Sequence, residues 1–78
     1  MSLRLIPLSN LKKGDRGIIK ELSRNDLSLK LLEMGFLPGE TVIIHKVAPL
    51  GDPISVKIGT YVLSLRRDEA DAVIVQVQ

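Results

Sequence analysis

The sequence contains no cysteine and no tryptophan, and its only aromatic residues are Phe36 and Tyr61. Without cysteine the chain can form no disulfide, thiolate metal site or cysteine nucleophile. Two aromatic residues are too few for the stacking row with which small barrels bind nucleic acid, or for the groove that holds polyproline peptides. These absences exclude several common functions of small domains.

Histidine is also scarce, since His45 is the only one in the chain. A transition-metal site usually needs three or four converging ligands, and one imidazole does not supply them. Asp52 and Glu40 are acids that could approach His45, although the sequence does not show it. We therefore predict no required cofactor, and His45 stays the one candidate ligand for a divalent transition metal.

Recognisable catalytic motifs are missing too. The six glycines are scattered and match no phosphate-binding loop, and the nine acids form no recognisable metal-binding motif. A catalytic carboxylate pair is conceivable in principle, but a barrel of this size leaves little room for an enclosed pocket. A serine or threonine nucleophile would have to use His45 as its base, without a recognisable strand–turn–helix elbow around it. We therefore expect that the protein is not an enzyme.

No apolar run in the chain approaches the length of a membrane span, and the N-terminus lacks the apolar stretch of a signal peptide. We therefore expect a cytoplasmic protein. The net charge is +2, with 11 basic and 9 acidic residues. The nearest basic clusters are two pairs, Lys12-Lys13 and Arg66-Arg67. They leave a nucleic-acid-binding barrel as an alternative, but we favour ordinary solvated surface and expect no nucleic-acid partner.

The 78 residues, of which 45% are hydrophobic, are enough for a single domain over 1–78. Helical periodicity occurs once, where Leu27, Leu31 and Met34 recur on one face and predict a helix over 26–34. Asn25 or Asp26 is expected to cap its start, and Gly35 its end.

The rest of the chain has the pattern of strands and turns. The β-branched and alternating residues predict five strands, with a bulge near Gly17 in the first and a polar helical turn at 68–71. Leu37-Pro38-Gly39-Glu40 fits a type II turn. The predicted fold is mainly β, a small SH3-like five-stranded barrel, closed to remove its edges, with one short inserted helix. The predicted strands are 16–22, 41–47, 54–58, 61–65 and 72–78.

The predicted helix carries more leucine than one buried face requires. Leu29 and Leu32 fall outside the stripe that faces the barrel, so at least one of them is expected to meet solvent. Beside Phe36 and Leu37 at the helix exit, they could form an apolar patch of the kind that marks a protein contact. We take five residues as the candidate partner-binding set: Leu29, Leu31, Leu32, Phe36 and Leu37.

Three segments together resemble the ferrous iron transport protein A family. They are Leu31-Leu32-Glu33-Met34-Gly35-Phe36-Leu37-Pro38-Gly39, Ala48-Pro49-Leu50-Gly51-Asp52-Pro53-Ile54 and Leu63-Ser64-Leu65-Arg66. The resemblance extends from about residue 8 to 77 and implies an SH3-like barrel. It also implies a cytoplasmic accessory role in Fe²⁺ uptake, at the inner face of the membrane, through docking onto a permease that carries a GTP-binding domain.

The resemblance also keeps an alternative open. The same fold forms the C-terminal domain of iron- and manganese-dependent repressors, so the chain could be a regulatory domain that binds Fe²⁺ or a similar transition metal. A homodimer is a further possibility, because an exposed barrel edge can pair between copies.

Overall fold

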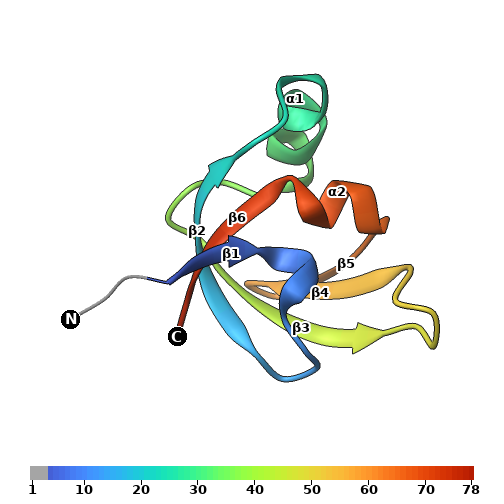
Figure 1. The fold of residues 1–78 in the computed structure, drawn as a ribbon. Coiled ribbons are helices and arrows are strands. Elements are labelled where there is room, and N and C mark those ends of the chain that lie inside the picture. The colour runs from blue at the N-terminus through green and yellow to red at the C-terminus, as the bar shows by residue number, and fades with distance from the viewer. Residues whose placement is uncertain (1–3) are drawn as a thin grey trace.

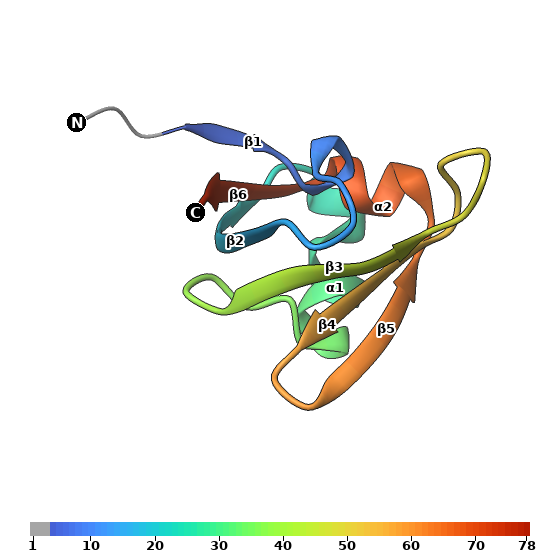
Figure 2. The same cartoon turned by 90° about the horizontal axis from the view of Figure 1, so that it is seen from below.

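The computed structural model describes residues 4–78, so the first three residues of the predicted domain lie outside it. The chain forms mainly β structure with two short α-helices and one 3-10 helix (Figures 1 and 2). In chain order the elements are β1 (Leu5–Pro7), η1 (Leu8–Asn10), β2 (Arg16–Leu22), α1 (Asn25–Met34), β3 (Thr41–Val47), β4 (Ile54–Ile58), β5 (Tyr61–Leu65), α2 (Arg67–Asp71) and β6 (Val73–Val77).

All strands pair antiparallel in one sheet of order β1-β6-β2-β3-β4-β5. The sheet curls around the core, as Figure 2 shows. Within the described chain its backbone pairing runs from β1 to β5, so hydrogen bonds do not close the predicted barrel. The mainly β fold with a short inserted helix is confirmed, with six strands in place of five.

The additional strand is β1, which pairs with β6 through Leu5, Ile6 and Pro7. Three residues ending in proline carry no strand signal in the sequence, because proline lacks the N–H that a ladder needs. The strand is tolerated because it lies at the edge of the sheet, where one side of the backbone needs no partner.

Strand β2 has the predicted bulge, but not at the predicted position near Gly17. The register of β2 shifts between Ile19 and Glu21, whereas Gly17 pairs regularly with Val42 and Val77. Gly17 instead gives the neighbouring strand room. A Cβ at this position would lie 3.0 Å from the Cβ of Val75, so a larger residue here would have to displace Val75.

The core lies on the inner side of the curled sheet. Alternate residues of each strand point inward, as expected for period two, and Leu31 and Phe36 add to them from the helical segment. Leu27 and Met34 are half-buried against this core, so the predicted buried face of the helix is confirmed. Among the described residues, neither helix is long and apolar enough to cross a bilayer.

Candidate protein-docking surface

Helix α1 begins one residue earlier than predicted and without the predicted cap. The cap position is Arg24, and neither Asn25 nor Asp26 accepts a capping hydrogen bond with its side chain. Asp26 instead pairs with Arg24, with 2.5 Å between Nη2 and Oδ2. This hydrogen bond from the guanidinium lowers the pKa of the Asp26 carboxyl. The acid still lies in the first turn, where its charge complements the helix dipole.

The end of α1 follows the sequence prediction closely. Gly35 adopts a left-handed conformation with φ of 108°. Its N–H donates to the carbonyl of Leu32, and the N–H of Phe36 donates to the carbonyl of Leu31, both at 3.0 Å. These are the two bonds of a Schellman motif, which turns the chain sharply and directs Phe36 back into the core.

The turn after the helix also forms as predicted. The N–H of Glu40 donates to the carbonyl of Leu37 at 3.0 Å, and Gly39 has φ of 96°, which fits the third position of a type II turn. The turn begins at Leu37, three residues after the last residue of α1. The helix and its exit are thus constrained by backbone bonds at both glycines.

The structure divides the five predicted partner-binding residues into two groups. Leu31 and Phe36 are completely buried, so they cannot meet a partner, and for these two the prediction is wrong. They are buried because one faces the core on the inner helix stripe and the other is returned there by the glycine turn. Leu29, Leu32 and Leu37 remain exposed, by 68%, 38% and 46%.

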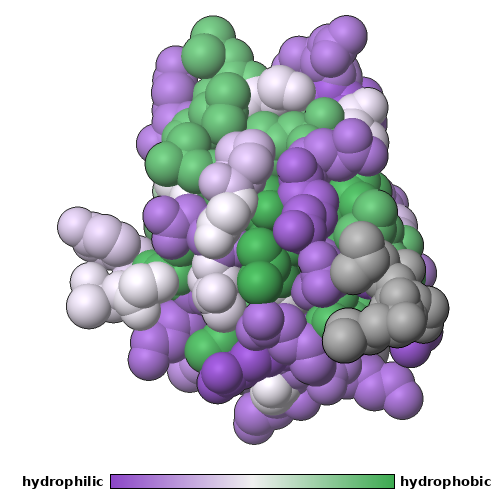
Figure 3. Space-filling model, turned by 90° about the vertical axis from the view of Figure 1, so that its left-hand side faces the viewer, coloured by the Kyte–Doolittle hydropathy of each residue, from purple (hydrophilic) through white to green (hydrophobic). Residues whose placement is uncertain are grey.

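We call Leu29, Leu32 and Leu37 the α1 leucine surface. Hydrophobic atoms gather at the top of the molecule in Figure 3, where α1 lies. Side chains on a helix whose opposite face is anchored lose little further freedom when a partner covers them, so they suit a docking role.

Helix α1 is tied to α2 by an ion pair between Lys30 and Glu69, with 2.5 Å between Nζ and Oε2. The other carboxylate oxygen of Glu69 accepts the backbone N–H of Arg66 at 2.8 Å. The Glu69 side chain is almost buried, and the hydrogen bond from Lys30 is the main reason that the pKa of Glu69 is lowered. This pair links the helix that carries the exposed leucines to α2.

Leu50, which is not among the predicted partner-binding residues, is 93% exposed in the loop between β3 and β4. The loop is well anchored, since Gly51 donates to the carbonyl of Ala48 at 2.8 Å and Asp52 accepts the N–H of Arg67 at 3.2 Å. A leucine directly after Pro49, between the predicted strands 41–47 and 54–58, was the available signal. The loop lies away from α1 in Figures 1 and 2, so Leu50 is not part of the α1 leucine surface.

The candidate metal ligand His45 is exposed on β3, at the irregular register between Ile44 and Lys46. Within residues 4–78 no group of three histidine, cysteine or acidic side chains could hold a metal ion together. Asp52, one of the acids that could have joined it, hydrogen-bonds to the backbone of α2 instead. Within the described residues, His45 therefore has no group of further candidate ligands around it.

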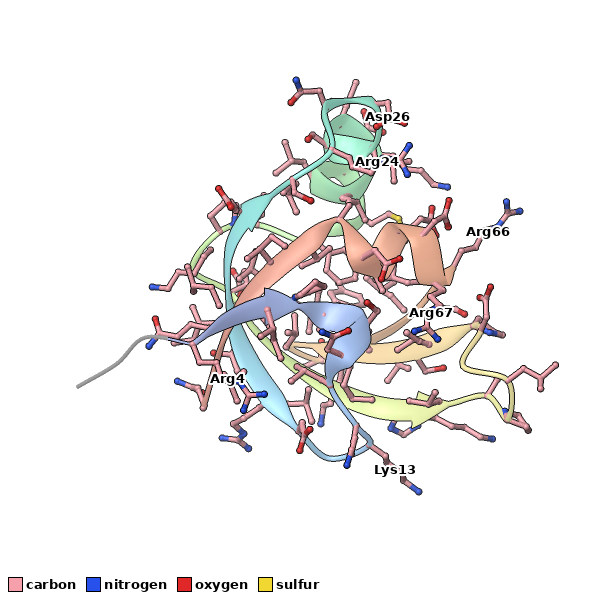
Figure 4. All side chains as sticks on the ribbon, viewed as in Figure 1. Arg4, Lys13, Arg24, Asp26, Arg66 and Arg67 are labelled. Carbon is pink, nitrogen blue, oxygen red and sulfur yellow. The ribbon has the colours of Figure 1, made fainter. Side chains whose placement is uncertain are left out.

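The four cations of the nucleic-acid alternative do not come together. Figure 4 shows Lys13 at the lower side of the molecule and Arg66 pointing away at the upper right, beside α2. An open pocket of about 340 Å³ lies on the side of Lys12, lined by Arg4, Ile6, Asn10, Leu11, Lys12, Asp15 and Val77. No aromatic side chain lines this pocket, so it provides no stacking platform for a base.

Comparisons with known proteins agree with this geometry. The FeoA domain family model matches residues 6–77. The Fe(2+) transport protein A/Fe(2+) transporter FeoB fusion protein of Porphyromonas gingivalis is 38% identical over 71 residues. The alignment covers 90% of this chain and 8% of that protein, so the chain spans only a small part of its relative.

Solved structures give the same result. Iron(II) transport protein A of Clostridium thermocellum is 48% identical, with a TM-score of 0.85 over 92% of this chain and 45% of that one. FeoA of Stenotrophomonas maltophilia, described as an SH3 domain protein complexed with zinc, is 29% identical, with a TM-score of 0.76 over 96% and 89% of the two chains.

The IdeR protein of T. acidophilum shares the fold alone, at 20% identity and a TM-score of 0.84 over 100% of this chain and 36% of that one. The SH3-like fold is therefore confirmed, and the relatives at 38% and 48% identity are named for ferrous iron transport. With a family match over residues 6–77 and relatives of 38% and 48% identity, this chain belongs to the FeoA domain family.

Proposed function

We propose that this protein is an accessory component of ferrous iron uptake that docks onto the GTP-binding membrane permease through the α1 leucine surface. The observation that carries the proposal is Leu29, which is 68% exposed on a helix whose opposite face is fixed in the core. The relative from Porphyromonas gingivalis supports the choice of partner, because it joins a transport protein A region to FeoB in one chain. In this role the chain itself catalyses no reaction.

The size of the surface fits a modest but specific contact. Burying a leucine side chain contributes roughly 1.5–3 kcal/mol when it is fully exposed beforehand, so the partly exposed Leu29 contributes about 1–2 kcal/mol. Leu32 and Leu37 contribute less, because more of each is already covered. A partner that covers all three side chains would therefore gain binding free energy equal to at least about a tenfold change in Kd, since 1.4 kcal/mol corresponds to a factor of ten.

The test is calorimetric titration of purified permease with Leu29→Glu. A carboxylate at the centre of an apolar contact is costly to desolvate, so we expect the Kd to rise at least about tenfold. The matched control is Leu50→Glu, which makes the same chemical change at a still more exposed leucine away from α1. Circular dichroism checks that both variants are folded.

We expect Leu50→Glu to bind as the wild type does. An unchanged Kd for folded Leu29→Glu contradicts the α1 leucine surface, and so does an equal loss for both variants. Co-purification with the permease, with and without GTP, then tests whether the nucleotide state controls docking. A protein held in this way works on the cytoplasmic side, at the inner face of the membrane.

Metal binding is the second candidate function, because the Stenotrophomonas maltophilia relative was solved with zinc. For this chain it predicts a saturable site for Fe²⁺ that depends on His45. Anaerobic titration of the wild type and of His45→Ala with Fe²⁺ decides it. Stoichiometric heat that disappears in the variant supports the site, and the absence of stoichiometric heat in the wild type rejects it.

A further inference from the structure

A row of cations crosses the outer face of the sheet. In the register of the strands, Arg16 of β2 lies opposite Ile43 of β3, and Ile43 lies opposite Lys57 of β4. Val42 and Ile44, the neighbours of Ile43, are buried, so this row points to the outside. Strands two positions apart are separated by roughly 10 Å, which brings the two charges within about one Debye length in physiological salt.

Two further cations extend the row. Lys46 lies opposite Ser55, whose neighbours Ile54 and Val56 are buried, so Lys46 belongs to the same outer face. Lys13 comes from the loop before β2, which is fixed beside β3 because Gly14 donates to the carbonyl of Ile44 at 2.9 Å. Figure 4 shows Lys13 pointing outward at the lower side of the molecule.

We call Lys13, Arg16, Lys46 and Lys57 the basic sheet face. All four are exposed. Within residues 4–78 the ion pairs are Arg24–Asp26 and Lys30–Glu69, both of which involve α1, so none of the four cations has a carboxylate partner there. Arg24 and Lys30 are thus neutralised beside α1, whereas the four cations of the basic sheet face form no ion pair in the described chain. Such an arrangement attracts a polyanionic surface.

We propose that the basic sheet face binds the anionic phosphodiester headgroups of a membrane. Clustered lysine and arginine side chains are attracted by the negative surface potential of anionic lipids, each adding to the affinity. The choice of a membrane over other polyanions rests on the proposed function, because the permease lies in one. Single-stranded nucleic acid is a poorer match, since neither aromatic residue of the chain is among the residues of this face.

Membrane contact and permease docking use different sides of the molecule. Helix α1 packs on the inner side of the sheet, where Leu31 joins the core, while the basic sheet face points the other way. In Figure 1, α1 lies at the top and β3 at the bottom. A chain held on the bilayer by its sheet therefore keeps the α1 leucine surface free for the permease.

The test is co-sedimentation of the full chain with vesicles of equal parts phosphatidylglycerol and phosphatidylcholine, and with vesicles of phosphatidylcholine alone. We expect binding to the anionic vesicles only, at about 0.1 M salt, and its loss near 1 M. Lys57→Glu should lower the partition coefficient on the order of tenfold, because the charge changes by two. Lys13→Glu in the loop gives a second variant if Lys57→Glu does not fold.

The matched control is Arg66→Glu, which makes the same change in net charge beside α2 (Figure 4). It should alter vesicle binding less than about twofold. Equal losses in both variants would show attraction by net charge alone and overturn the proposal. So would equal binding to neutral vesicles, no binding to anionic ones, or tighter binding to a short duplex DNA or single-stranded RNA.

Two cross-measurements separate this proposal from the permease contact. Leu29→Glu should bind anionic vesicles as the wild type does, whereas Lys57→Glu should keep the wild-type Kd for detergent-solubilised permease. If Leu29→Glu also loses vesicle binding, the contact with lipid runs through α1 and the basic sheet face is not the membrane site.

Discussion

At the residue scale, Glu69 is a nearly buried acid whose two carboxylate oxygens both have partners. Its two carboxylate oxygens are shared between the ammonium of Lys30 and the backbone N–H of Arg66. The acid is nearly buried, whereas the Lys30 side chain is 60% exposed. The ion pair is screened by solvent, so the carboxylate stabilises the fold mainly through its charge-assisted hydrogen bond to the N–H at the start of α2, which a neutral amide would make more weakly.

The substitution Glu69→Gln tests the contribution of the charged Glu69 carboxylate to stability. We expect a loss of about 1 kcal/mol in the free energy of unfolding at neutral pH, measured by urea denaturation. The folded state lowers the pKa of Glu69 below its usual value of 4.5, so its stabilisation is complete above that pH and is lost as the pH falls further. The difference between wild type and variant should therefore shrink in acid. A difference that persists unchanged below about pH 3 contradicts the assignment.

At the element scale, the end of α1 depends on one backbone conformation. Gly35 occupies the left-handed region, and a Cβ there would meet nothing within 4 Å. A substitution at this position therefore changes the energy of the backbone without a steric clash. The Schellman bonds and the return of Phe36 to the core both depend on this turn.

Gly35→Ala should lower the free energy of unfolding by about 1 kcal/mol or somewhat more, because an L side chain disfavours positive φ. Glu33→Ala, at an exposed position of the same helix, is the comparison and should change it much less. Chemical denaturation of both variants measures the difference. Equal stability of Gly35→Ala and wild type would show that the turn relaxes to another conformation.

At the scale of the whole molecule, a 78-residue chain has a small free energy of unfolding, so one core substitution can remove much of it. Domains of this size have a free energy of unfolding of about 4–12 kcal/mol. Phe36 is a fully buried aromatic residue at the junction of α1 with the sheet. Its burial therefore contributes a large part of the free energy of unfolding. A substitution that destabilises the core at Phe36 should therefore also disturb the adjacent helix α1, which carries the proposed docking surface.

Phe36→Ala should cost about 3–5 kcal/mol, enough to leave much of the protein unfolded at 37 °C. Phe36→Leu retains most of the apolar volume and should cost distinctly less. Thermal denaturation followed by circular dichroism compares the two. If Phe36→Ala melts as the wild type does, Phe36 is not the anchor that its burial indicates.

Local signals in the sequence determined α1, its glycine end, the Pro38-Gly39 turn and four of the five predicted strands within their bounds. These features depend on side-chain period and on the backbone freedom of single residues, which neighbours in the chain decide. The tertiary structure alone decided the pairing of β1 and the position of the bulge in β2, at Lys20. It also brought Arg16, Lys46 and Lys57 onto one face. Each of these results depends on register between strands that are distant in sequence, and no local pattern carries that information.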